Sequence, residues 1–277
     1  MYIDSHVHFW KPSRGDYGWL KPENELLYQD YLPGQLLPEL GAFGVKGLVA
    51  VQAAVTAEEA AFLLEMAQTW RVISGVSGGL DPFADTFHEE LASLKADPCF
   101  TGIRLSGSAF RSERSKADQS KLRSALAALM QAGLTLDLLV KPEDLSDVAS
   151  YLEELPLLNA VVNHLGCPDI RGQRMEPWRT GMERLSQHPS VVVKLSGMIT
   201  MAGGFYPEKL RPYIAQLLQL FGSDRLLFGS DWPVALQAGG YRDVIDLFEA
   251  VLPDDLTEEE KGMIRAGNAS RFYPILT

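Results

Sequence analysis

Eight short runs of β-branched and other apolar residues recur along the chain, each bounded by Gly, Pro, Asp or Asn. Such runs are typical of buried β-strands. Most of the intervals between them carry the apolar spacing of amphipathic helices, for example 57–70, 120–132, 142–155, 210–221 and 242–252. The expected strands span residues 2–9, 46–54, 72–80, 100–105, 134–140, 160–165, 191–195 and 225–230.

Two of the expected helices begin with a capping signal. Thr56 precedes Ala57-Glu58-Glu59, and Thr257 precedes Glu258-Glu259-Glu260. In a capping box, the threonine hydroxyl accepts the third helical N–H, and the glutamate at that third position reaches back to the threonine N–H. We expect both threonines to start helices in this way, the second of them a terminal helix.

The alternation of strands and helices predicts an α/β fold. Strands joined through helices run parallel with right-handed crossovers. Eight such units in 277 residues suit a closed (β/α)8 TIM barrel better than an open sheet. The Gly-rich stretch at 75–79 lacks the spacing of a dinucleotide-binding loop, and no break in composition divides the chain. A single domain over residues 1–277 is therefore expected.

Composition narrows the class of protein further. With 46% hydrophobic and 22% charged residues the chain is an ordinary globular protein, and its net charge of −11 opposes binding to nucleic acid or anionic lipid. No apolar window reaches the length of about 18 residues that a membrane span needs, and no signal-peptide pattern is seen. We expect a cytoplasmic protein in which Cys99 and Cys167 are reduced and structural.

Polar residues gather near the carboxyl ends of the expected strands. The side of a barrel strand that faces the helices is apolar, so polar residues that alternate with apolar ones point to the axis or the mouth. The carboxyl ends of the strands are where barrel enzymes keep their chemistry. The residues that this alternation turns inward are Asp4, His6, His8, Gln52, Arg104, Asp137, His164 (with Val162), Lys194 and Asp231.

His6 and His8 form the sharpest local signal. Two positions apart on a strand, their imidazoles lie on one side about 6–7 Å apart, able to share a metal ion or a substrate oxygen. Asp231 ends the last strand, where it could activate water as a general base above the space left by Gly229. His164 is a third imidazole candidate. The structural alternatives are histidines bonded to the backbone and a turn aspartate.

Other polar and aromatic residues have two interpretations each. Arg104 could hold a substrate carboxylate or carbonyl, or form an ion pair with Asp137. Lys194 could bind a carbonyl or be the partner of a neighbouring carboxylate. The long, aromatic-rich segment 10–36 includes Trp19, which with Trp232 could wall a small pocket or serve only in packing.

Several of these segments match a known family in order and spacing. The chain resembles the amidohydrolase superfamily, in particular its lactonase branch of metal-dependent TIM-barrel hydrolases, which includes sugar-acid and pyrone-dicarboxylate lactonases. The similar segments run from end to end: Ile3-Asp4-Ser5-His6-Val7-His8-Phe9-Trp10, Gly15-Asp16-Tyr17-Gly18-Trp19-Leu20, Val51-Gln52-Ala53, Gly102-Ile103-Arg104, Asp137-Leu138-Leu139-Val140, His164-Leu165-Gly166, Lys194-Leu195-Ser196-Gly197 and Leu227-Phe228-Gly229-Ser230-Asp231-Trp232-Pro233.

The resemblance implies roles for matching residues. It implies that His6, His8 and His164 surround the scissile carbonyl, that Asp231 is the base for water and that Arg104 contacts the substrate. For the metal it leaves two alternatives, one Zn²⁺ held by His6, His8 and Asp231, or a reaction that needs no metal. The chain departs from the lactonase pattern at Cys167, where a lysine is common, and at Gly79, where a tryptophan is common.

We therefore expect a hydrolase of carbohydrate metabolism that opens the ester ring of a small lactone. One rival function is a metal-dependent decarboxylase or hydratase on the same scaffold. Another is a catalytically silent binding protein, in which Asp231 would be locked to a basic residue. The partner is a small molecule, and a homo-oligomer is left open. The catalytic candidates are Asp231, His164, His6 and His8, and the substrate-binding candidates are Arg104, Gln52, Lys194, Trp19 and Trp232.

Overall fold

A computed structural model describes residues 1–273 and residue 275. Its eight strands are parallel and lie in one sheet in the same order as in the sequence. The apolar runs predicted each of them, although several strands are shorter than expected. The strands are β1 (Tyr2–Val7), β2 (Val45–Val51), β3 (Ile73–Gly78), β4 (Phe100–Ser106), β5 (Thr135–Leu139), β6 (Ala160–Val162), β7 (Val191–Leu195) and β8 (Leu226–Phe228).

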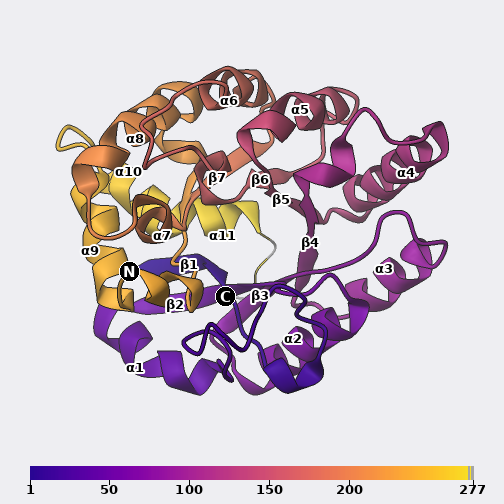
Figure 1. The fold of residues 1–277 in the computed structure, drawn as a ribbon, viewed down its shortest axis with the longest axis horizontal. Helices are drawn as coiled ribbons and strands as arrows, with labels where there is room; N and C mark the ends of the chain where they lie inside the picture. Colours follow the sequence, from indigo (N-terminus) through magenta and orange to yellow (C-terminus); the bar gives the residue numbers. More distant parts are fainter. Residues whose placement is uncertain (274, 276–277) are drawn as a thin grey trace.

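The helices form a ring around the strands (Figure 1). The predicted single-domain (β/α)8 TIM barrel is confirmed. The expected helix at 142–155 is a short turn followed by a helix, and the other four begin and end within a few residues of their predicted bounds. The helices are α1 (Pro33–Phe43), α2 (Ala57–Thr69), α3 (Phe87–Lys95), α4 (Lys116–Ala132), α5 (Leu145–Glu153), α6 (Trp178–Ser186), α7 (Met198–Ala202), α8 (Pro207–Phe221), α9 (Tyr241–Val251), α10 (Glu258–Gly262) and α11 (Asn268–Phe272).

The ends of β1 and β8 close the barrel. Val7 pairs with Trp232 in a parallel bridge, and the His8 N–H donates to the Trp232 carbonyl at 2.7 Å. The Asp231 N–H donates to the His6 carbonyl at 2.8 Å. Closure thus places residues from the two ends of the chain side by side at the carboxyl ends of the strands.

The buried apolar residues form two layers. The larger one lies between the sheet and the helices. The smaller one fills the barrel interior and is covered from below by α11 and the residues that flank it, with Tyr273 fully buried among strand residues. Apolar material thus fills the amino end of the barrel, which leaves the carboxyl end for polar groups. The inner layer comprises Ile3, Val49, Val51, Val161, Val192, Leu227, Ala266, Ala269 and Tyr273.

Simple alternation is wrong for two strands. In β1 it placed Asp4 with His6, but a register irregularity follows Asp4, which instead bonds to the Tyr241 hydroxyl of α9 at 2.9 Å. A bulge shifts the side-chain alternation by one residue, which explains the change of face. In β6 alternation turned Val162 inward, whereas Val161 belongs to the inner layer and Val162 to the outer one.

The two expected capping boxes differ. The Thr257 box is complete, because the Glu260 N–H bonds to Thr257 Oγ1 at 3.2 Å and the Thr257 N–H bonds to Glu260 Oε2 at 2.8 Å. At the start of α2 only half of the box forms. Thr56 Oγ1 accepts the Glu59 N–H at 3.2 Å, but the Glu59 carboxylate bonds to the Ala53 N–H instead of returning to Thr56.

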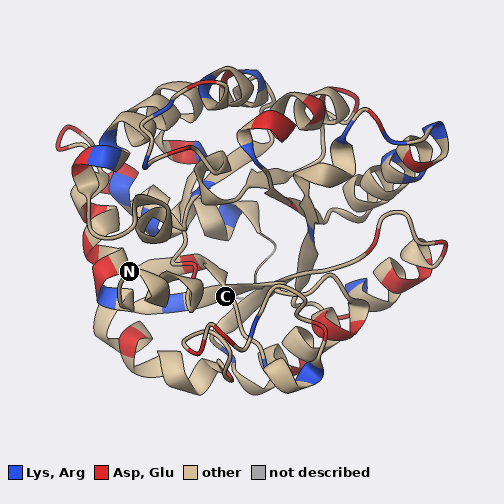
Figure 2. Ribbon diagram, viewed as in Figure 1, with Lys and Arg blue, Asp and Glu red and all other residues tan. Residues whose placement is uncertain are grey.

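Most charged residues lie on the outer helices and their loops (Figure 2). Both signs are interspersed there, so the negative net charge forms no single acidic face in this view. Within the part of the chain that the structure describes, no helix is both long and apolar enough to cross a bilayer.

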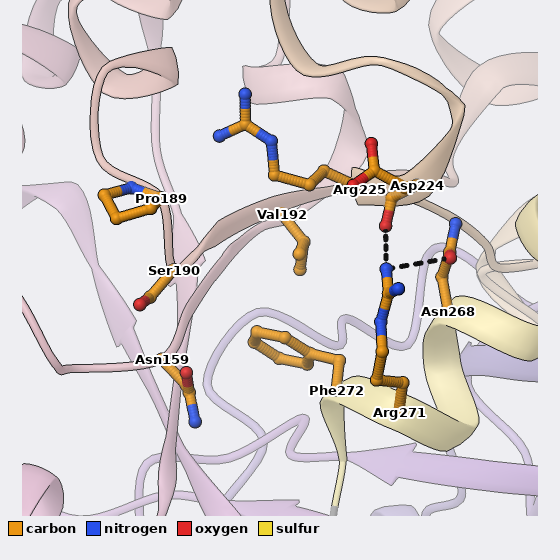
Figure 3. A pocket seen from close by; sticks show the side chains of 9 residues that line it. All are labelled: Asn159, Pro189, Ser190, Val192, Asp224, Arg225, Asn268, Arg271 and Phe272. Carbon is orange, nitrogen blue, oxygen red and sulfur yellow. Dashed lines mark hydrogen bonds between the residues drawn. The ribbon is translucent and has the colours of Figure 1, made fainter.

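A cavity of about 320 Å³ opens at the amino end of the barrel, between α11 and the starts of β7 and β8. Figure 3 shows Arg271 turned toward Asp224 and Asn268. Arg225, also in its lining, donates to the main-chain carbonyls of Phe221, Ser186, His188 and Leu220. These arginines therefore hold together the loops at the amino end of the barrel. Catalytic residues are expected at the opposite, carboxyl end of the strands.

Candidate active site

Three imidazoles and one carboxylate meet where β1 and β8 close the barrel. The Nε2 atoms of His6 and His8 are 3.2 Å apart. Asp231 Oδ1 lies 3.3 Å from His8 Nε2, 3.8 Å from His6 Nε2 and 3.9 Å from His164 Nε2. The structure thus brings together the four residues that the sequence singled out as catalytic candidates.

Asp231 and His164 occupy turns in which the backbone is left-handed. Their φ angles are 62° and 53°, values that residues other than glycine seldom adopt and that cost about 1–3 kcal/mol each. The turn at His164 therefore ends β6 at Val162, earlier than the sequence predicted, and β8 also ends early, at Phe228. The left-handed turn, and not the alternation along β6, carries the His164 ring into the cluster.

Two glycines allow the side chains to come this close. A Cβ at Gly197, whose φ is 65°, would lie 2.9 Å from His164 Nδ1. A Cβ at Gly229 would lie 2.8 Å from the His6 Cβ and 3.0 Å from the Ser196 Cβ. The expectation that Gly229 leaves room for substrate or solvent is therefore wrong, because His6 and Ser196 fill that space.

Hydrogen bonds at the rear of the rings orient the imidazoles. His8 Nδ1 lies 2.8 Å from the Val51 carbonyl oxygen, which can only accept. Nδ1 of His8 therefore carries a proton, and in the neutral ring Nε2 presents a lone pair to the cluster. His164 Nδ1 lies 2.9 Å from Ser196 Oγ. The same oxygen accepts a hydrogen bond from the His164 backbone N–H at 3.2 Å.

Electrostatics keep the carboxylate ionised and the His6 and His164 rings neutral. Burial on its own would raise the pKa of Asp231, but His164, His8 and Arg104 more than offset it, and the pKa is lowered from its usual value of 3.8. Burial lowers the pKa of His164 to about 4 and that of His6 well below 6.5. At neutral pH the cluster thus offers a charged base beside two uncharged rings.

Gln52, which follows β2, and Arg104 of β4 form a hydrogen-bonded pair. Arg104 Nη2 donates to the Gln52 carbonyl at 2.6 Å, and both residues are buried. Arg104 Nε is buried and finds no hydrogen-bond partner among the described residues. The alternative of an ion pair between Arg104 and Asp137 is not what the structure shows, because Asp137 bonds to Lys194 instead.

Lys194 lies beneath the cluster. Its Nζ is 2.5 Å from Asp137 Oδ1 and 3.5 Å from His6 Nδ1, and neither Lys194 nor Asp137 is exposed. The Tyr273 hydroxyl also donates to the Asp137 carboxylate, at 3.2 Å. Of its two predicted roles, Lys194 has the one of partner to a neighbouring carboxylate.

The two tryptophans predicted to wall the site differ in exposure. Trp232 is buried and packs against Phe9 and Tyr31, with ring centroids 6.0 Å and 5.2 Å away. Trp19 is 46% exposed, lies edge-on to Trp10 and donates its indole N–H to the Ala53 carbonyl at 2.8 Å. Trp19 therefore has a free face for a ligand, whereas Trp232 mainly supports the loop.

The donor set of the cluster suits a divalent metal. His6, His8 and Asp231 each offer one ligand atom, and these atoms lie within 4.8 Å of one another. Two imidazole nitrogens and a carboxylate oxygen form a set that binds Zn²⁺ with a coordination position left for water. The lone pair on His8 Nε2 already points at the cluster, so the residues fit a single ion.

Ser196 and Asp4 support the cluster, a role that was not predicted for them. Ser196 holds His164, and its place two residues after Lys194, directly after β7, was the available signal. Asp4 accepts the backbone N–H groups of His6 and Ser230, at 3.2 and 2.8 Å, and so fixes both ends of the cluster. Burial raises the pKa of Asp4 to about 6, although these hydrogen bonds lower it.

Comparisons with known proteins show the family of this chain. The amidohydrolase family model matches residues 3–275. The L-fucono-1,5-lactonase of Burkholderia ambifaria is 34% identical over 99% of this chain and 95% of its own length. That of Burkholderia multivorans is 33% identical over 99% and 96%.

Among solved structures, an amidohydrolase from Burkholderia multivorans with bound zinc has a TM-score of 0.89 and 30% identity, with complete coverage of both chains. Fold, site geometry and sequence lead to the same assignment. The chain belongs to the amidohydrolase family.

Proposed function

We propose that this protein hydrolyses the ester ring of a sugar-acid lactone. The observation that carries the proposal is the Asp231 carboxylate, which is ionised, buried and surrounded by three imidazoles at the closure of the barrel. Relatives that are L-fucono-1,5-lactonases, at 33–34% identity over nearly the whole chain, support a lactone as the substrate class.

Asp231 is the general base in this mechanism. Its carboxylate removes a proton from water, the water oxygen attacks the lactone carbonyl, and the protonated carboxyl then returns the proton to the departing ring oxygen. The backbone hydrogen bond from Asp231 N to the His6 carbonyl holds the carboxylate in place during both transfers. No other residue needs to move a proton between the two steps.

The negative charge on the attacked carbonyl oxygen needs donors. His164 supplies one in this proposal, and Arg104, whose Nε finds no partner among the described residues, binds the substrate. A single donor of this kind contributes about 10²–10³ in rate. A divalent ion held by His6, His8 and Asp231 would polarise the carbonyl and lower the pKa of water when bound.

The rival functions receive less support. A silent binding protein was expected to lock Asp231 to Lys194 or Arg104, yet within the described chain the ion-pair contacts of Asp231 are to His6, His8 and His164. A decarboxylase or hydratase would use the same cluster to move a proton to or from carbon. The lactonase relatives do not favour that chemistry.

A panel of lactones tests the proposal directly. We expect the purified, chelator-treated protein to release acid from 1,5-lactones of six-carbon sugar acids, measured by a proton-release assay with the uncatalysed rate subtracted. Repeating the assay with added zinc decides between the two metal alternatives. Release of carbon dioxide from aromatic acids, with no lactone opened, would contradict the proposal and favour the decarboxylase.

The dependence of kcat/KM on pH reports on the base. Asp231 has a lowered pKa, and His164 has one of about 4, so both stay in their working forms as the pH falls from 8 to 5. We expect Asp231 and His164 to keep the protein active across that range, with activity lost through them only near pH 4 or below. Circular dichroism at each pH separates this loss from unfolding, and a complete loss of activity below pH 6.5 in the folded protein would contradict the assignment.

The proposal also covers where the protein acts. We expect it in the cytoplasm as an enzyme of carbohydrate metabolism that takes a small, neutral or anionic substrate.

Both cysteines are free, and burial raises the pKa of Cys167 to about 12 and that of Cys99 above 9.0. These thiols are therefore unreactive at neutral pH and serve as packing groups.

A further inference from the structure

Two consecutive peptide groups at the end of β2 anchor three side chains from separate parts of the chain. The Gln52 carbonyl accepts from Arg104 of β4 at 2.6 Å, and the Ala53 carbonyl accepts from the Trp19 indole at 2.8 Å. The Ala53 N–H donates to Glu59 Oε1 at 2.8 Å. The orientation of this turn therefore decides where Arg104 and Trp19 lie.

Glu59 is buried in a way that its position alone does not require. It lies in the first turn of α2, where the adjacent Glu58 is exposed, yet Glu59 has no exposed surface. Its Oε2 finds no partner among residues 1–273 and 275. Burial raises the pKa of Glu59 to about 8. Because burying a carboxyl group is unfavourable, the bond to Ala53 must serve something beyond capping the helix.

The start of α2 also holds the loop that carries Trp19. Thr56 Oγ1 donates to Asp16 Oδ2 at 3.0 Å, and Asp16 in turn pairs with Arg14 at 2.7 Å. The Arg14 guanidinium lies 4.8 Å from the ring of Phe62, one helical turn after Glu59. The loop after β1 thus contacts the start of α2, next to the Gln52–Ala53 turn to which Glu59 is hydrogen-bonded.

We propose that Glu59 is a positioning residue for substrate recognition, which fixes the Gln52–Ala53 turn and through it the orientations of Arg104 and Trp19. This inference rests on the proposed lactonase function for its substrate. Within the described residues Glu59 makes no hydrogen bond to the imidazole cluster or Asp231, so its loss should weaken substrate binding and leave the chemical step unchanged.

Kinetics of matched variants test the inference. In Glu59→Met the side chain keeps its length but cannot accept the Ala53 N–H, and we expect KM for the lactone to rise about tenfold while kcat stays within about threefold. Glu59→Gln keeps an oxygen acceptor and should restore a KM close to that of the wild type. Glu58→Met, which changes an exposed glutamate in the same helical turn, is the control for helix-end charge.

A spectroscopic measurement separates positioning from a general loss of structure. The indole N–H resonance of Trp19, assigned with Trp19→Phe, should shift in Glu59→Met and remain in place in Glu59→Gln and Glu58→Met. If Glu59→Met does not fold, Glu59→Asp, which retracts the carboxylate by one methylene, replaces it in both measurements.

Failure of the positioning role can be distinguished from failure of the proposed function. If the folded Glu59 variant keeps the wild-type KM and an unshifted Trp19 resonance, the positioning role is overturned. A fall in kcat with an unchanged KM would overturn it as well. If the wild type opens no lactone, the proposed function fails, and the Trp19 resonance alone still decides whether Glu59 sets the turn.

Discussion

Replacing Asp231 by asparagine is expected to reduce kcat for lactone hydrolysis by about 10²–10⁴-fold, the usual contribution of a general base. Asparagine keeps the size of the side chain and tolerates a left-handed backbone, so the φ of 62° poses no obstacle. The amide cannot take a proton from water at any pH of the assay. KM should change little, because the carboxylate acts on water and not on the ground-state lactone.

The control for this variant is an exposed aspartate. Asp85 pairs with Lys121 at the surface at 2.7 Å, and Asp85→Asn should leave kcat unchanged and the melting temperature within about 1–2 °C. The melting temperature of Asp231→Asn should stay close to that of the wild type, because the neutral His6 and His164 rings remain beside the new amide. If Asp231→Asn keeps a wild-type kcat, the general base must be sought elsewhere.

The barrel could be predicted because its signals are local. Each strand is a short apolar run between turn residues, and each long helix shows its period, so neither requires knowledge of distant contacts. The end of β6 was predicted too late for a physical reason. His164 adopts a left-handed turn, and a residue other than glycine gives no sign of such a turn in a sequence.

The sequence predicted which residues gather at the candidate site, but not how each of them is oriented. Alternation correctly turned Lys194, Arg104 and Asp137 into the barrel, because those strands are regular. It was wrong for Asp4, where the strand register shifts, and a bulge is not visible in an apolar pattern.

The sequence could not predict which polar residues bond to each other inside the barrel, for a different reason. Asp137 could reach Lys194 or Arg104, and only the three-dimensional register decides which. The Glu59 carboxylate likewise had two N–H groups within reach, at Thr56 and Ala53, and it bonds to the second. Sequence therefore gives the face of a polar residue, whereas its partner depends on distances between strands and helices.

The pair of Lys194 and Asp137 leads to the largest expected effect on stability. Neither residue is exposed, and their charged atoms are 2.5 Å apart in the barrel interior. Lys194→Met keeps the length of the side chain but leaves Asp137 buried, with the Tyr273 hydroxyl as its one remaining side-chain partner among the described residues. Removing one partner of a buried ion pair costs about 3–5 kcal/mol in the free energy of unfolding. For a chain of this size we expect the melting temperature to fall by about 10 °C.

The double variant Lys194→Met/Asp137→Leu separates the cost of an unpaired charge from the loss of the ion pair. Apolar side chains in place of both charges are often neutral for stability, so the double variant should recover most of the lost melting temperature. Lys121→Met, which breaks the exposed pair with Asp85, should change it by only about 1–2 °C. A Lys194→Met protein that melts like the wild type would contradict a stabilising role for this ion pair.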